Sequence, residues 1–285
     1  MTHYILKISC PATSGIVAAV TTYLAGRECY LSELAQFDDE YTGRFFMRAV
    51  FRFNAGCTPD IEALRQGFAD VGVPFSMDWQ LFDSSTPTRV LLMVSKFDHC
   101  LTDLLYRYHK GEMDMQITAI VSNHLDLRPM AEREGIRFIY LPVTKDTKAQ
   151  QEGELLKIVE ETKTDLVVLA RYMQILSDDL CKQLNGRAIN IHHSFLPGFK
   201  GAKPYHQAHA RGVKMIGATS HYVTRELDEG PIIAQDVVAI GHRELPEELV
   251  ARGRDVERRV LARAVKAHLE DRVFLNGSRT VVFAH

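Results

Sequence analysis

The sequence has 285 residues, enough for two domains or one large one. Its 46% hydrophobic and 25% charged residues are typical of a soluble globular chain, and a net charge of -2 argues against nucleic acid as the main partner. No apolar run reaches the roughly 20 residues of a membrane span, and the N-terminus lacks a signal-peptide pattern. The five cysteines are widely spaced without a Cys-x-x-Cys pair, so we expect a cytoplasmic protein with neither a disulfide framework nor a zinc knuckle.

Residues 1–83 alternate between strand and helix signals. Strands are predicted over residues 3–9, 30–37, 44–53 and 75–81, and helices over residues 15–26 and from Thr58-Pro59 to Gly72. Within residues 44–53, apolar side chains share one face and Arg48 and Arg52 share the other, which we expect to be wet or covered by a partner. The order βαββαβ predicts a ferredoxin-like domain.

A polar segment with one proline, residues 84–88, is predicted to be a linker to a second domain over residues 89–285. Short apolar runs at residues 90–94, 117–121, 138–141, 166–170 and 188–191 are separated by helical patterns, such as the one at residues 99–108. Residues 215–223 and 231–239 flank a turn at Asp228-Glu229-Gly230 and predict an antiparallel pair, and residues 246–269 predict a long helix. The second domain is therefore an open α/β sheet, whose sites lie at the carboxyl ends of its strands.

Asn190 and His192 stand where one of these buried strands ends. They lie two residues apart and so point to the same side of the strand. An amide donor beside an imidazole suits an acyl carbon that becomes tetrahedral, and Asp228 is a carboxylate that can orient the imidazole. The alternative is that Asn190 makes only turn hydrogen bonds and Asp228 belongs to an ordinary hairpin.

The surrounding residues favour the catalytic interpretation. The run Asn190-x-His192-x-Ser194-x-Leu196-Pro197-x-Phe199-x-Gly201, followed by His221 and by Leu227-Asp228-x-Gly230-Pro231, resembles the signature of the folate-dependent formyltransferase family. The resemblance implies a Rossmann-like formyltransferase domain in which Asn190, His192 and Asp228 are catalytic and His221 supports them. It also implies a folate pocket, with contacts from Arg171, Met173, Ile175, Leu176, Arg225 and Leu227.

The first strand of the second domain is followed by a segment without glycine, since none occurs between Gly72 and Gly111. The glycinamide ribonucleotide formyltransferase of this family has a glycine-rich phosphate loop there, and side chains with a Cβ wrap a phosphate poorly. Lys96, Asp98 and His99 stand in its place, and we expect them to fill the acceptor pocket or to hold water.

Three further segments are similar to the formyltetrahydrofolate deformylase family, and this resemblance covers essentially the whole chain. They are Gln36-Phe37-Asp38-Asp39 with Thr42-Gly43-Arg44-Phe45-Phe46-Met47-Arg48, His99-Cys100-Leu101-x-Asp103-Leu104-Leu105, and Gly253-Arg254-Asp255-Val256-Glu257. The resemblance implies hydrolysis of 10-formyltetrahydrofolate to tetrahydrofolate and formate, with no metal or cofactor beyond this substrate and water. The alternatives are a formyltransferase with a non-phosphate amine acceptor and a non-catalytic, folate-responsive binding protein. The sequence leaves three metabolic roles open, namely supply of formate for purine synthesis, balance of the folate pool and catabolism.

The same resemblance makes residues 1–83 an ACT domain, a module that pairs with copies of itself and binds small effectors. It therefore implies a homo-oligomer and an amino-acid effector such as methionine or glycine. Ala12 and Tyr30 replace the usual Asp and Asn of this module. These two departures count against effector binding and leave assembly as the alternative role.

Overall fold

The computed structural model describes residues 2–198 and 204–284 of the chain. These fold into two compact units. The first holds the described residues of Met1–Pro87, Asp271–Phe274 and Val281–His285, and the second holds those of Thr88–Glu270 and Leu275–Thr280. Among the described residues, no helix is both long enough and apolar enough to span a bilayer. The linker and the domain boundaries predicted above stay predictions.

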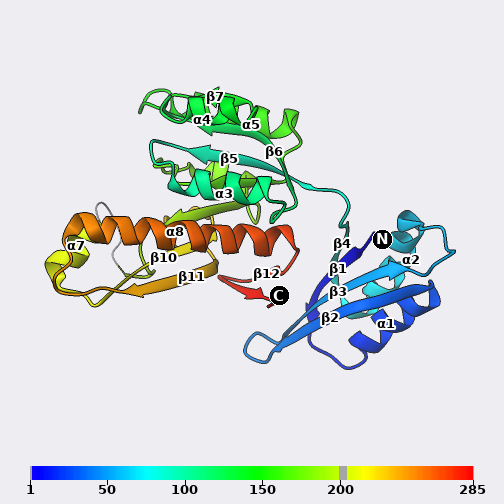
Figure 1. The fold of residues 1–285 in the computed structure, drawn as a ribbon. Helices are drawn as coiled ribbons and strands as arrows, with labels where there is room; N and C mark the ends of the chain where they lie inside the picture. Colours follow the sequence, from blue (N-terminus) through cyan, green and yellow to red (C-terminus); the bar gives the residue numbers. More distant parts are fainter. Residues whose placement is uncertain (1, 199–203, 285) are drawn as a thin grey trace. The chain divides into compact units, whose positions relative to one another are not determined.

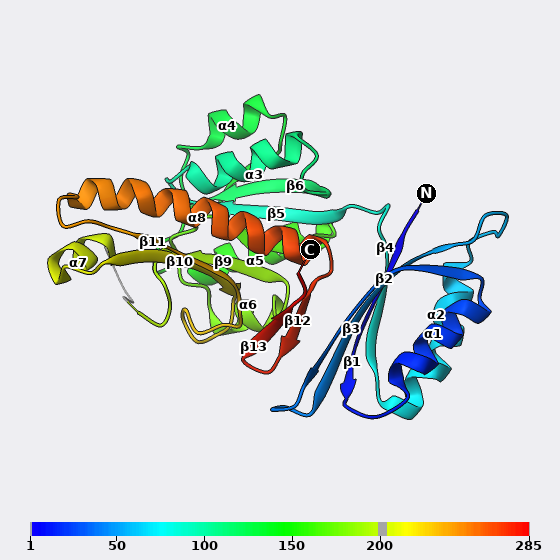
Figure 2. The same ribbon diagram turned by 60° about the horizontal axis from the view of Figure 1, so that its bottom comes forward.

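The first unit is a four-stranded antiparallel sheet in the order β2-β3-β1-β4, with both helices on one face (Figure 2). Its elements are β1 (Tyr4–Pro11), α1 (Ile16–Gly26), β2 (Cys29–Asp39), β3 (Arg44–Phe53), α2 (Ile61–Gly72), the 3-10 helix η1 (Val73–Phe75) and β4 (Asp78–Asp83). Apolar side chains of β1 and β3 pack under α1 and α2. The predicted ferredoxin-like arrangement is confirmed.

Two local predictions in this unit were wrong. Helix α2 begins at Ile61 rather than at Thr58-Pro59, because the side chain of Asp60 caps it by accepting from the Ala63 N–H. The face of β3 that carries Arg48 is not wet at this residue, since Arg48 is only 6% exposed, whereas Arg52 stays partly exposed. Phe274, from β12 (Val273–Asn276), contacts Phe46 on this face with ring centroids 5.8 Å apart.

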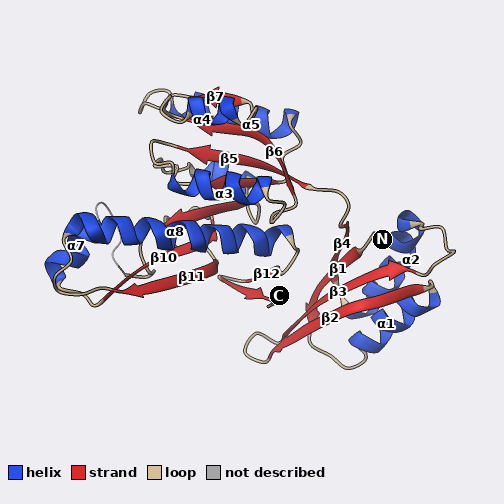
Figure 3. Cartoon of the chain, in the orientation of Figure 1, coloured by secondary structure: helices blue, strands red, loops and turns tan. Residues whose placement is uncertain are grey.

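The second unit contains a seven-stranded sheet in the order β11-β10-β9-β8-β5-β6-β7 (Figures 1 and 3). Strands β7, β6, β5, β8 and β9 are parallel, whereas β10 and β11 are antiparallel, as predicted. The elements are β5 (Thr88–Val94), α3 (His99–His109), β6 (Met115–Ser122), α4 (Arg128–Arg133), β7 (Phe138–Tyr140), α5 (Lys148–Glu161), β8 (Leu166–Leu169), α6 (Asp178–Gln183), β9 (Ala188–His192), α7 (Pro204–Arg211), β10 (Met215–Tyr222), β11 (Ile232–Ala239) and α8 (Pro246–Leu269). A strand β13 (Arg279–Val282) pairs with β12 to form a hairpin that the sequence did not predict.

The strand order of this sheet reverses between β5 and β8. From β5 the chain proceeds outward through β6 and β7, and it then returns to the other side of β5 with β8 and β9. Such a reversal opens a crevice at the carboxyl ends of the strands. Residues of α5 and α6 cover one face of the sheet, while α3 packs against α8, which in turn runs along β9, β10 and β11. The crevice therefore lies where β5, β8 and β9 end.

Candidate active site

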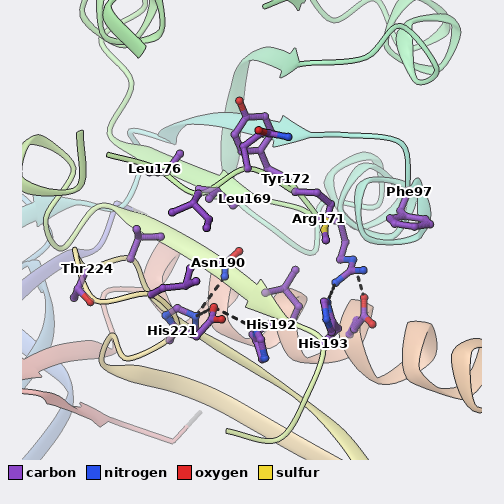
Figure 4. A pocket seen from close by; sticks show the side chains of 18 of the residues that line it. Phe97, Leu169, Arg171, Tyr172, Leu176, Asn190, His192, His193, His221 and Thr224 are labelled. Atoms are coloured by element: carbon purple, nitrogen blue, oxygen red, sulfur yellow. Dashed lines mark hydrogen bonds and ion pairs between the residues drawn. The ribbon is translucent and has the colours of Figure 1, made fainter. Parts of the chain in front are cut away.

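A cavity of about 600 Å³ occupies this crevice (Figure 4). Its walls come from segments far apart in the sequence, namely Phe97 and His99 after β5, residues 171–176 after β8, residues 190–193 of β9 and the following loop, residues 224–228 after β10, and Arg254 and Glu257 of α8. Phe97 and Arg171 lie at one end of the cavity and Leu176 and Thr224 toward the other, with Asn190 and His192 between them. The residues predicted to be catalytic thus lie at the middle of the cavity.

Strand β9 delivers Asn190 and His192 to the cavity from the same side of the sheet, as alternation along a strand requires. Its neighbour β10 pairs His221 directly with Asn190. His221 is 3% exposed, and its Nε2 lies 3.4 Å from the Asn190 Nδ2. Burial lowers the pKa of His221, more than its contacts with the Tyr222 carbonyl and Asp228 raise it. His221 is therefore a neutral ring beside the amide.

Asp228 reaches the same centre from the turn after β10. Its backbone is left-handed, with φ of 58°, a conformation that Asp tolerates better than most residues. Its Oδ1 lies 3.2 Å from Nδ1 of His192 and 3.8 Å from Nε2 of His221. Burial raises the pKa of Asp228, but the hydrogen bond from His192 and the electrostatic attraction of the neighbouring imidazoles outweigh it and leave this pKa lowered. Asp228 is thus an ionised carboxylate that holds the His192 ring.

The other nitrogen of His192, Nε2, is the one that does not contact Asp228. Nε2 of His192 is buried and has no hydrogen-bond partner within residues 2–198 and 204–284. The ring stacks on His193, with centroids 5.1 Å apart and planes 18° apart. Arg171 donates from its guanidinium to Nδ1 of His193, and since an arginine can only donate, this nitrogen carries no proton. Arg171 thus holds the His193 ring that stacks on His192.

The loop after β9 is tied to the neighbouring strands. Thr219 of β10 donates to the Ser194 carbonyl at 2.9 Å and accepts from the Leu196 N–H at 3.0 Å. Ser194 itself donates to the Gly198 carbonyl at 2.7 Å. These bonds fix the chain directly after His192. Phe199 and Gly201 of the sequence motif lie outside the described residues.

The six residues predicted to contact folate all line the cavity, and they are Arg171, Met173, Ile175, Leu176, Arg225 and Leu227. Met173, Ile175 and Leu227 are about half exposed, and their gathering at one cavity is the kind of apolar surface that marks a ligand site. The loop that carries Met173 is anchored to the end of β5, because the Met173 N–H donates to Ser95 Oγ at 3.0 Å. The side chain of Arg171 differs from the others, since it turns toward His193 and Glu257.

The segment after β5 contains the three residues expected at the acceptor pocket, and they do not all line the cavity. His99 lines the cavity together with its neighbour Phe97, whereas Lys96 and Asp98 are exposed and are not among the described lining residues. Glu257, which is 1% exposed on α8, also lines the cavity, although it was expected only as part of a family-like segment and not as a site residue. The sequence feature that could have pointed to it is a charged glutamate directly after Val256, within the apolar stripe of a long helix.

Three side chains near this end offer atoms that a metal ion could use. Ligand atoms of His99, Cys100 and Glu257 all lie within 4.8 Å of one another. However, Nε2 of His99 already contacts Glu257 Oε2 at 2.7 Å, and burial raises the pKa of the Cys100 thiol well above its usual value. The same carboxylate also pairs with Arg171 and accepts from Tyr205, so the geometry favours a hydrogen-bonded cluster.

Comparisons with known proteins agree with this geometry. The family model described as formyl transferase matches residues 88–265. A formyltetrahydrofolate deformylase of Corynebacterium sp. (strain P-1) is 52% identical over 281 residues, which cover 98% of either chain. The crystal structure of a formyltetrahydrofolate deformylase from Burkholderia mallei superposes with a TM-score of 0.96 at 54% identity, and the match covers 100% of both chains. A glycinamide ribonucleotide transformylase from Symbiobacterium toebii is more distant, with a TM-score of 0.66 at 26% identity over 72% of this chain and 98% of its own.

Proposed function

The chain belongs to the formyltetrahydrofolate deformylase family, and we propose that it hydrolyses 10-formyltetrahydrofolate to tetrahydrofolate and formate. The observation that supports this most directly is the ionised Asp228 holding His192 beside Asn190 in one cavity. An amide donor and a base that is oriented by a carboxylate are the groups that attack on an acyl carbon requires.

In the proposed reaction, the Asn190 amide donates to the formyl oxygen as this oxygen gains negative charge. Asp228 and His192 together remove a proton from the attacking water, whose oxygen bonds to the formyl carbon. The unpartnered Nε2 of His192 then passes a proton to N10 of the folate as the C–N10 bond breaks. Formate and tetrahydrofolate leave, and no metal or further cofactor enters any step.

The folate itself is proposed to enter between the loop of Met173, Ile175 and Leu176 and the turn that carries Arg225 and Leu227. The exposed apolar side chains of both segments supply a slot, and their backbone amides and carbonyls can pair with the pterin edge. The formyl group on N10 then faces Asn190, because Asn190 lies between the two ends of the same cavity.

Three further properties belong to this proposal. The cysteines Cys10, Cys29, Cys57, Cys100 and Cys181 are all free thiols, which supports work in the reducing cytoplasm. The first unit is proposed to be an ACT domain that assembles the protein into a homo-oligomer. Ala12 and Tyr30 make assembly, rather than binding of an amino-acid effector, its proposed role.

The test is release of formate from 10-formyltetrahydrofolate with no acceptor present, for the wild type and for Asp228→Asn. We expect steady release by the wild type. We expect a loss of about 10²–10⁴ in kcat for the variant, which no longer orients His192 through a charge. Release only after an amine is added would identify a transferase, and folate binding without any turnover would identify a folate-responsive binding protein.

A further inference from the structure

Glu257 is a buried carboxylate in the cavity wall for which the proposed reaction has no use. Its Oε2 lies 2.7 Å from Nε2 of His99 and 3.2 Å from Nε of Arg171, and its Oε1 accepts from the Tyr205 hydroxyl at 2.6 Å. Burial raises the pKa of Glu257, but the hydrogen bond from His99 and the charge of Arg171 outweigh it, so this pKa is lowered. An anion with these partners stabilises one fixed arrangement of side chains from three segments of the chain.

Helix α8 is shaped to admit one of these partners. Gly253 precedes Glu257 by one helical turn and therefore shares its face. A Cβ on Gly253 would lie 2.1 Å from Cζ and 2.3 Å from the hydroxyl of Tyr205. Glycine inside a helix is less favourable than alanine. Here the glycine leaves the space through which the Tyr205 ring reaches Glu257.

Arg171 brings the loop after β8 to the same place. Its backbone is left-handed, with φ of 67°, a conformation that residues other than glycine rarely adopt. Its guanidinium carbon lies 5.3 Å from the centroid of the Phe97 ring, and Arg254 of α8 lies 5.7 Å from the same centroid. Figure 4 shows Phe97 and Arg171 at the end of the cavity away from Thr224 and Leu176.

This end of the cavity is the approach to the reacting carbon. Folate enters from the Leu176 and Leu227 side in the proposed function, so an acceptor reaches the formyl carbon from the opposite side. The cluster is connected to His192 there through His193, because Arg171 bonds to His193, whose ring stacks on His192. A water molecule needs only its own volume beside His192, whereas an amine must also place its carbon chain where the cluster lies.

Resting on the proposed function, we propose that Glu257 determines the choice of acceptor. It holds His99, Arg171 and Tyr205 at the acceptor end of the cavity, so that water reaches the formyl carbon and a primary amine does not. Glu257 is a positioning residue, since it acts through its three partners. Without this arrangement, an amine nitrogen bonds to the formyl carbon, the C–N10 bond breaks, and His192 carries the proton of the amine to N10.

The test measures how the formyl group is divided between two acceptors. Glycinamide, a small primary amine, is added with 10-formyltetrahydrofolate, and formate and N-formylglycinamide are quantified together by NMR. The variants are Glu257→Gln, which removes the charge, and Gly253→Ala, which displaces Tyr205. The matched control is Gly153→Ala in α5, where a Cβ meets nothing within 4 Å.

We expect the wild type and Gly153→Ala to yield formate alone. In Glu257→Gln and Gly253→Ala, the ratio of formylated amine to formate should rise about tenfold or more above the wild-type detection level. Because this ratio is independent of total activity, a variant that is merely less stable leaves it unchanged. Tyr205→Phe, which removes one hydrogen bond and keeps the ring, should show a smaller rise.

An unchanged ratio in all three variants overturns the inference, and so does loss of turnover in all three without any formylated amine. The proposed function fails separately, if the wild type releases no formate when no amine is present. Formate release by the wild type combined with an unaltered ratio in the variants defeats only the role of Glu257.

Discussion

Asn190 Nδ2 lies 3.4 Å from Nε2 of His221, across the pairing of β9 with β10. The other ring nitrogen of His221, Nδ1, lies 2.8 Å from the carbonyl oxygen of Tyr222, which can only accept. His221 therefore carries its proton on Nδ1 and accepts from Asn190 through Nε2. This contact sets the orientation of the Asn190 amide and leaves its second N–H for the cavity.

The amide gives the first prediction. Asn190→Ala should lower kcat for formate release by about 10²–10³, because one donor to the developing oxyanion is lost. The KM for 10-formyltetrahydrofolate should change little, since this bond strengthens only in the transition state. Asn190→Asp has the same size but no N–H, and it should be at least as impaired. Near-wild-type kcat in Asn190→Ala would exclude Asn190 as the oxyanion donor.

The buried ring of His221 predicts a pH dependence of stability. Its pKa in the folded protein lies below the ordinary value of about 6.5, so below that pH the unfolded chain binds a proton that the folded chain refuses. The free energy of unfolding should therefore fall as the pH drops from about 6.5 toward the lowered pKa. His221→Gln lacks this ionisation and should lose less stability between about pH 7 and pH 5.5. Urea unfolding of both proteins at the two pH values measures the difference, and equal losses would contradict the assignment.

The turn that presents Asp228 depends on a close approach at Gly230. A Cβ there would lie 1.8 Å from the Tyr222 carbonyl oxygen and 3.1 Å from Nδ1 of His221. Gly230→Ala should therefore push the turn off β10, lower the free energy of unfolding by about 1–3 kcal/mol and reduce kcat as Asp228 moves. Urea unfolding and formate release measure both effects.

The control for this substitution is Gly241→Ala. A Cβ on Gly241 would lie 3.6 Å from Glu244 Oε2, an ordinary contact. This variant should therefore resemble the wild type in both measurements. If Gly230→Ala behaves like Gly241→Ala, the position of Asp228 does not depend on the tight turn.

Much of the fold could be predicted because its signals are local and periodic. Alternation placed Asn190 and His192 on one side of β9, and the helical spacing of Val256, Val260 and Ala264 marked the buried stripe of α8. Asp228 stands in a recognisable turn between two strands. Each of these features is set by neighbours within a few residues, so the sequence contains them without knowledge of the tertiary structure.

The Glu257 cluster and the packing of the C-terminal residues could not be predicted, because their partners are distant in the sequence. In the sequence, Glu257 is a single charged residue within an apolar stripe. Its partners Tyr205 and Arg171 come from α7 and from the loop after β8. Phe274 follows a helix of the second unit, yet it packs on Phe46 of the first. No local pattern specifies which surface such a segment will cover.

Ser95 leads to the last prediction, because it connects the ends of two strands. It is 2% exposed, donates to Asn123 Oδ1 at 2.6 Å and accepts from the Met173 N–H. Ser95→Ala should lower the free energy of unfolding by about 1–3 kcal/mol, because both partners lose a buried hydrogen bond. It should also raise the KM for folate more than it lowers kcat, since the Met173 loop is released while Asn190 and His192 stay on β9. Ser32→Ala, at an exposed serine of β2, should change neither quantity. Loss of stability in Ser95→Ala with an unaltered KM would show that this anchor supports the fold without positioning the loop for folate.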